Sequence, residues 1–191
     1  MIGSHQIRRH GSSELLDLGM AATLIGLDMA TRLLPHPPNF TAIAASGLFA
    51  GAVLRSRILA LAVPLAAMAL SDGVLGFYDW PTMAAVYFGL AVPAWLGLFV
   101  RRFHLALLLP AAAVCSLFFF IETNFAVWLF SGIYPRHIDG LIACYVAALP
   151  FFHNTLNGDV FWTATMLLSY WIARICLAKG ASMTAPVPAS R

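Results

Sequence analysis

Charged residues are scarce in this 191-residue chain: Asp, Glu, Lys and Arg make up only 10% of it, whereas soluble domains contain about 25%. Hydrophobic residues account for 61% of the chain, and its mean hydropathy is +0.83. A core built in water from a chain of this length cannot bury so many apolar side chains. The composition excludes an ordinary soluble domain and predicts an all-α, polytopic membrane helical bundle.

Signatures of catalysis and metal binding are also missing. The three cysteines, Cys115, Cys144 and Cys176, are far apart and form no CxxC motif, which favours free thiols packed in helices. The chain has no GxSxG, Walker or HExxH motif. We therefore expect neither an enzyme nor a resident cofactor or metal, and the small net charge of +3 gives no indication of nucleic-acid binding.

Apolar stretches of about 20 residues predict membrane spans. We expect six transmembrane helices, at residues 15–34, 40–54, 58–77, 82–100, 103–121 and 160–178. Residues 138–152 predict a short re-entrant or surface helix, with a seventh span as the alternative. The expected domains are an N-terminal tail (1–14), one transmembrane domain (15–178) and a disordered C-terminal tail (179–191).

The distribution of basic residues predicts the orientation of these spans. With the N-terminus inside, nine of the 11 Lys and Arg residues lie on the inner side, and only Arg32 and Arg136 lie outside. This asymmetry follows the positive-inside rule. We expect a protein of the bacterial cytoplasmic (inner) membrane with both termini in the cytoplasm.

Polar and aromatic groups concentrate on the predicted outer side. In residues 32–40 (RLLPHPPNF), three prolines stiffen a loop that holds Arg32, His36 and Asn39 in fixed directions. Further clusters follow at residues 71–81, 122–137 and 151–159. Aromatic walls with a few convergent polar groups predict a small-molecule pocket, although an ordinary membrane interface has the same composition. The expected substrate-binding residues are Arg32, His36, Asn39, Asp72, Asp79, Trp80, Asn124, Tyr134, Arg136, His153 and Asn154.

Asp28 is a carboxylate inside the first predicted span, where a charge is costly. Arg32 lies four residues later on the same helix face, so we expect Asp28 to pair with Arg32 and support the site from behind. Metal binding by His36, His137 and His153 is an alternative, although no two of them have the spacing of helical ligands.

Small residues recur every four positions in the first two spans, and such rows let helix backbones approach closely. The rows are Gly47 with Gly51, and Ala22 with Gly26 and Ala30. Packing within one bundle and docking on a partner protein both remain open for the row in the first span.

Several motifs resemble an uncharacterised family of small bacterial six-span membrane proteins. They are residues 32–40, 48–51 (LFAG), 71–76, 123–128 (TNFAVW) and 150–155 (PFFHNT). More distantly, the size and span number resemble the S components of energy-coupling-factor (ECF) vitamin transporters, including a solitary type that binds cobalamin. This resemblance implies capture of a vitamin from the outer side. It also implies docking of Ala22, Gly26 and Ala30 on a transmembrane coupling subunit that works with ATPases.

These observations predict a membrane-embedded substrate-binding protein for uptake of a vitamin-like small molecule, with a corrinoid as the first guess. An intramembrane enzyme acting on lipid or isoprenoid head groups through Asp28 and Asp72 is one alternative. A transition-metal uptake protein is the other.

Overall fold

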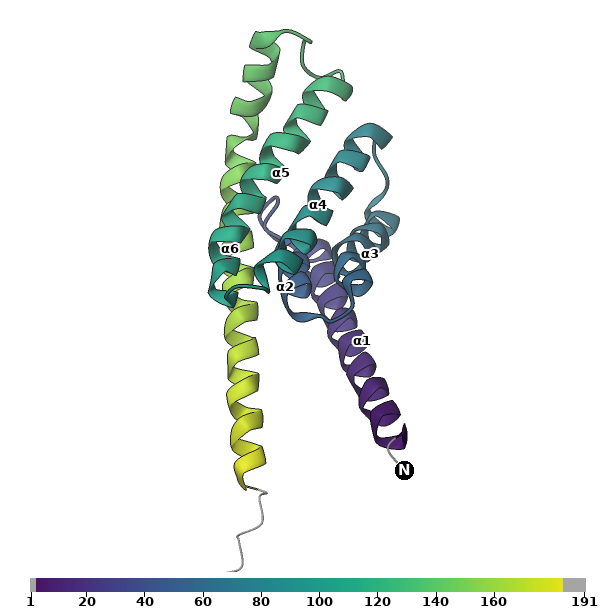
Figure 1. The fold of residues 1–191 in the computed structure, drawn as a ribbon. Coiled ribbons are helices and arrows are strands. Elements are labelled where there is room, and N and C mark those ends of the chain that lie inside the picture. Colours follow the sequence, from purple (N-terminus) through teal and green to yellow (C-terminus); the bar gives the residue numbers. More distant parts are fainter. Residues whose placement is uncertain (1–2, 184–191) are drawn as a thin grey trace, which may run out of the picture.

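The computed structural model describes residues 3–183, and describes side chains for residues 13–179. The described chain is all-helical, with six α-helices and one short 3-10 turn (Figure 1). The elements are α1 (Gly3–Leu33), α2 (Ile43–Val53), α3 (Arg57–Leu75), α4 (Trp80–Val100), η1 (Leu105–Leu107), α5 (Leu108–Phe130) and α6 (Ile138–Met183).

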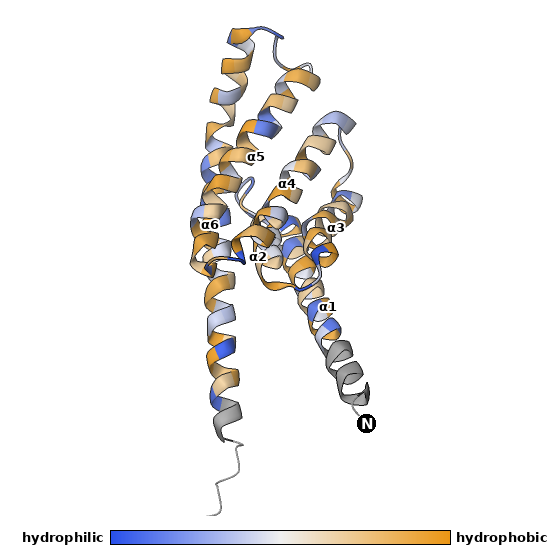
Figure 2. Cartoon of the chain, viewed as in Figure 1, coloured by the Kyte–Doolittle hydropathy of each residue, from blue (hydrophilic) through white to orange (hydrophobic). Residues whose placement is uncertain are grey.

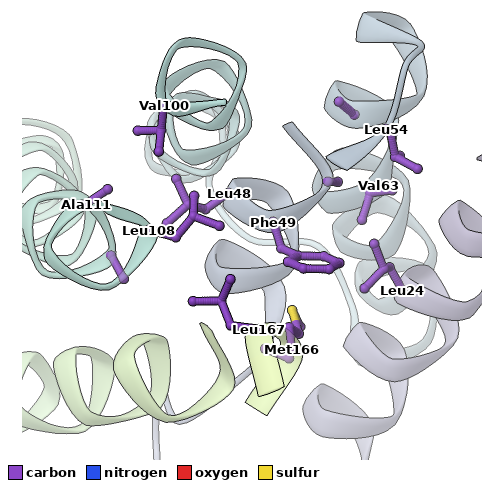
Figure 3. Close-up of a cluster of buried hydrophobic side chains, with 14 of the residues drawn as sticks. Leu24, Leu48, Phe49, Leu54, Val63, Val100, Leu108, Ala111, Met166 and Leu167 are labelled. Atoms are coloured by element: carbon purple, nitrogen blue, oxygen red, sulfur yellow. The ribbon is translucent and has the colours of Figure 1, made fainter. Parts of the chain in front are cut away.

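The short helix α2 lies at the centre of the bundle, and eight of its 11 residues are buried. It packs against α4, α3 and α6, while α1 packs against α3 and α5 against α6. In Figure 3, Leu48 and Phe49 of α2 lie among apolar side chains from every other α-helix. These are Leu24, Val63, Val100, Leu108, Ala111, Met166 and Leu167.

Glycines let α2 and α4 approach at backbone contact. A Cβ atom on Gly51 would overlap the carbonyl oxygen of Ala94, and one on Gly97 would overlap that of Leu48. Gly47 also contacts Pro64 of α3, whose Cγ would lie 3.1 Å from an added Cβ. The small-residue row of the second predicted span is therefore packed inside the bundle.

Apolar side chains cover the outside of the helices. Figure 2 shows hydrophobic residues along much of the length of α3, α4, α5 and α6. Large examples include Phe88, Trp95, Val114 and Leu168, each about 60% exposed or more within the described chain. Water does not favour so much contiguous apolar surface, whereas lipid does.

Four of the described helical segments are long and apolar enough to cross a membrane: α3, α4, η1 with α5, and α6 up to Lys179. Helix α2 is apolar but has only 11 residues. Helix α1 is absent from this set of four, and it carries the charged residues Asp17, Asp28 and Arg32. The predicted all-α class is thus confirmed, and four described helical segments, which overlap four of the six expected spans, are candidate membrane spans.

The prediction of a separate helix at residues 138–152 is wrong, because α6 runs without a break from Ile138 to Met183. Residues 153–159, whose polar side chains suggested an interruption, are part of this helix. Asp159 contacts Ser116 of α5, and the amide of Asn157 lies 3.0 Å from the ring of His153. Gly158 marks close packing, since its position lies against the backbone of Phe40. Residues 179–183 of the predicted disordered tail belong to α6, so that part of the prediction is wrong, and residues 184–191 lie outside the described residues.

Candidate functional site

A cavity of about 450 Å³ lies beside residues 34–42, the loop that joins α1 to α2. All six α-helices contribute to its wall. Its polar lining comprises Arg32, His36, Asn39, Thr41, Tyr78, Thr82, Thr123, Asn124, Thr155 and Asp159, and its aromatic lining comprises Phe119, Phe120, Phe151 and Phe152. Pockets for small molecules typically measure about 300–1,000 Å³ and are mostly apolar with a few placed polar groups. The cavity has the size and composition of such a pocket.

The proline-rich loop is held in one conformation beside this cavity. The backbone N–H of Phe40 donates to the carbonyl of Pro37 at 3.0 Å, which closes a turn. Asn39 occupies the third position of that turn with φ of 64°, a left-handed conformation that Asn tolerates better than most residues. Thr31 accepts a hydrogen bond from the N–H of Ala42 at 3.1 Å and ties the loop back to α1. Arg32, His36 and Asn39 all lie in the cavity wall.

Arg32 is the centre of a polar network between α1, α3 and α4. Its Nη2 donates to Oδ1 of Asp72 at 2.6 Å, and its Nη1 donates to Oγ of Ser71 at 2.7 Å. The other carboxylate oxygen of Asp72 accepts a hydrogen bond from the hydroxyl of Tyr87 at 2.9 Å. Asp72 itself is fully buried, so it acts through Arg32, which lines the cavity.

The expected pairing of Asp28 with Arg32 is wrong. Asp28 is fully buried and its Oδ2 accepts a hydrogen bond of 2.5 Å from the hydroxyl of Ser46 in α2. Its Oδ1 is buried and has no hydrogen-bond partner among the described residues. Residues four apart lie on the same face of a helix. From this face of α1, however, the side chain of Asp28 contacts α2, whereas the longer side chain of Arg32 reaches α3.

Helices α5 and α6 supply the opposite wall. Ala148, Phe152, Thr155 and Asp159 line the cavity at spacings of four, three and four residues, so they form one face of α6. Oδ2 of Asp159 lies 2.6 Å from Oγ of Ser116. These lining residues of α6 were missed because a helix break was expected at this point. The helical spacing from 148 to 159 is the signal that would have found them.

The loop between α3 and α4 contributes Tyr78 and Asp79 in different ways. Tyr78 lines the cavity. Burial, followed by the charge of Asp72, raises the pKa of Tyr78 to about 12, which keeps its hydroxyl a neutral hydrogen-bond donor. Asp79 caps α4 by accepting from the N–H of Thr82 at 3.1 Å. Thr82 also lines the cavity.

Several expected site residues do not line this cavity. Trp80 is 71% exposed, and Arg136 and His153 are exposed as well. Tyr134 and Asn154 are half-buried at other positions. The cavity therefore brings together Arg32, His36, Asn39 and Asn124, with Asp72 directly behind Arg32.

The fold does not bring the three predicted outer histidines, His36, His137 and His153, together. In the part of the chain whose side chains are described, no three His, Cys, Asp or Glu residues lie close enough together to hold a metal ion. His36 lines the cavity, whereas His137 lies 3.8 Å from Asp139 at the start of α6.

The small-residue row of α1 faces away from the bundle. Ala22 and Gly26 are exposed and Ala30 is half-buried. A Cβ atom on Gly26 would meet no described neighbour within 4 Å. The row is therefore available for contact with another molecule, in contrast to the packed row in α2.

Comparison with known proteins identifies a family but not an activity. Neither the curated proteins nor the solved structures gave a match to this chain. The likeness to ECF S components therefore stays a hypothesis. Residues 13–180, nearly the whole chain, match a family of unknown function, DUF6580, and the chain belongs to that family.

Proposed function

We propose that this protein is a membrane-embedded binding protein for uptake of a vitamin-like small molecule from the outer face. One observation carries the proposal: a cavity whose wall is built by all six helices combines aromatic side chains with polar groups from α1, α4, α5, α6 and the loops that follow α1 and α3. Removing the polar side chains of this cavity from water costs free energy. A bound ligand that forms hydrogen bonds with them would offset this cost.

The proposed setting is the bacterial inner membrane, with six spans and both termini in the cytoplasm. The apolar outer surfaces of α3 to α6 support a membrane location. In Figure 1 the start of α1 and the end of α6 point to the same end of the bundle, as an even number of crossings requires. Arg55, Arg57, Arg101 and Arg102 lie in or beside the connections at that end, which agrees with the positive-inside rule.

The lining favours a ligand with a flat ring and several hydrogen-bonding groups. Phe119, Phe120 and Phe152 offer faces and edges to a ring, with Phe120 and Phe152 in mutual contact at 4.7 Å between centroids. Arg32 is already neutralised by Asp72, so its remaining role is to donate hydrogen bonds rather than to bind a full negative charge. A volume of about 450 Å³ favours a ligand smaller than a corrinoid.

No observation favours either of the two alternatives, an intramembrane enzyme or a transition-metal uptake protein. An enzyme using Asp28 and Asp72 as acid and base needs both carboxylates beside the substrate. Asp28 is bonded to Ser46 and Asp72 to Arg32 and Tyr87, and neither carboxylate lines the cavity.

We further propose that the exposed row on α1, formed by Ala22, Gly26 and Ala30, docks on a transmembrane coupling subunit. The absence of a described neighbour around Gly26 supports this part of the proposal.

The proposal is tested by identifying any small molecule that copurifies with the protein. The protein is extracted in mild detergent, and the extract is analysed by absorbance, elemental analysis and mass spectrometry. A tight binder retains one small molecule per chain, and cobalt would identify a corrinoid. An empty protein whose thermal unfolding is unchanged by a panel of vitamins would contradict the proposal.

A further inference from the structure

A second cavity, of about 280 Å³, lies where α3 begins and α4 ends. It is lined by Arg57, Trp95, Leu98, Phe99, Arg101 and Arg102. It belongs to the opposite end of α3 and α4 from Tyr78 and Asp79, so it is separate from the proposed substrate cavity.

The second cavity is a basic groove, and its three arginines, Arg57, Arg101 and Arg102, have no acidic partner among the described residues. Within residues 13–179, none of them forms an ion pair with a carboxylate. In the described part of the chain, the Arg101 side chain donates to the carbonyl of Leu54 at 3.4 Å. The neighbouring acid, Asp17, accepts hydrogen bonds from the backbone N–H groups of Arg55 and Ser56 at 2.9 and 3.3 Å. Three guanidinium groups thus surround one groove and repel one another unless an anion enters it.

The wall of the groove changes from apolar to cationic along α4. Trp95 and Phe99 are four residues apart and share one face of α4, and Arg102 follows just beyond the end of this helix. Trp95 is 66% exposed and Phe99 is 51% exposed. Aromatic side chains next to arginines at the end of an apolar helix match the boundary between acyl chains and headgroups.

We propose that this groove binds the phosphate of an anionic phospholipid. The guanidinium groups of Arg57, Arg101 and Arg102 hold the phosphate, since arginine forms forked, charge-assisted hydrogen bonds with it. The acyl chains then run along Trp95 and Phe99 on the outside of the bundle. This site is independent of the molecule that occupies the substrate cavity.

Native mass spectrometry after transfer from lipid nanodiscs tests this proposal. Nanodiscs contain phosphatidylcholine and phosphatidylglycerol in equal amounts. The wild type is expected to retain phosphatidylglycerol preferentially. Arg57→Gln and Arg102→Gln each weaken retention about fivefold. Arg55→Gln is the matched control, because Arg55 is an exposed arginine two residues from Arg57 that does not line the groove.

Three results would overturn the proposal. The first is equal retention of both lipids by the wild type. The second is a loss in Arg55→Gln as large as that in Arg57→Gln, which would indicate only a general charge effect. The third is a thermal shift with inorganic phosphate as large as that with phosphatidylglycerol, which would identify a free anion as the ligand. Arg102 lies beyond the end of α4, so its variant keeps the test valid if Arg57→Gln folds poorly.

Discussion

Arg32 at the end of α1 and Asp72 in α3 form an ion pair of 2.6 Å, although 40 residues separate them in sequence. The pair is shielded from solvent, with side-chain exposures of 17% for Arg32 and 1% for Asp72. It connects the α1 end of the proline-rich loop to the helix behind the cavity. The geometry of the proposed binding site therefore depends on this contact.

Removing one partner of the Arg32–Asp72 pair is expected to destabilise the protein strongly. Asp72→Ala leaves the guanidinium unpaired, and such a loss costs about 3–5 kcal/mol. The double variant Arg32→Met/Asp72→Ala removes both charges and should recover part of that loss. Thermal unfolding in detergent compares Arg32→Met, Asp72→Ala and the double variant with the wild type. Additive effects of the two single substitutions would contradict a direct interaction.

The contact between α2 and α4 predicts opposite effects for two glycine substitutions. Gly51→Ala forces a methyl group against the carbonyl of Ala94 and is expected to destabilise the protein by about 1–3 kcal/mol or more. Gly26→Ala in α1 meets no described neighbour within 4 Å and should stabilise the helix by up to about 1 kcal/mol. Unfolding midpoints test both, and equal effects would argue against the close packing of α2 on α4.

The hydroxyl of Ser116 is expected to stabilise the folded protein because it donates a hydrogen bond to the buried carboxylate of Asp159. Ser116→Ala removes the hydrogen bond to Asp159 and should cost about 1–3 kcal/mol. Ser169→Ala is the matched control, because Ser169 is exposed and donates only to the carbonyl of Thr165 in its own helix. Similar unfolding midpoints for the two variants would contradict a structural role of the Ser116–Asp159 contact.

Asp79 should stabilise the start of α4 in a pH-dependent way. Hydrogen bonds from Thr82 lower the pKa of Asp79 below the ordinary aspartate value. A lowered folded-state pKa means that the stabilisation is fully present above the ordinary aspartate pKa and is lost as the pH falls through the folded-state pKa. Wild type should therefore be more stable than Asp79→Ala at neutral pH, with the difference vanishing in acid. A difference that is independent of pH would contradict the capping role.

The sequence correctly predicted an all-helical chain with long apolar helices, a short second helix and a proline-rich loop before it. Each of these follows from local signals, namely composition, the length of apolar runs and proline. The partner of Arg32 was not predictable in the same way. Asp28 and Asp72 are both acidic residues in apolar surroundings, and only the packing of α1 between its neighbours decides which carboxylate Arg32 reaches.

The unbroken helix α6 is a second feature that local sequence signals did not predict. Residues 153–159 contain polar groups and a glycine that normally interrupt a helix. In the folded chain, Asp159 is satisfied by Ser116 from α5, and Gly158 accommodates Phe40 from the loop before α2. Both partners are distant in sequence, so the local pattern suggested a break where tertiary contacts preserve the helix.

Occupancy of the 450 Å³ cavity tests the central claim most directly. Ala148 is buried in the cavity wall, whereas Ala147 is exposed on the same helix, so Ala148→Phe fills the cavity and Ala147→Phe adds the same bulk outside it. Native mass spectrometry of the purified proteins measures the bound small molecule. We predict that wild type and Ala147→Phe retain it and that Ala148→Phe is empty while remaining folded. Equal occupancy in Ala148→Phe and wild type would contradict the assignment of this cavity as the binding site.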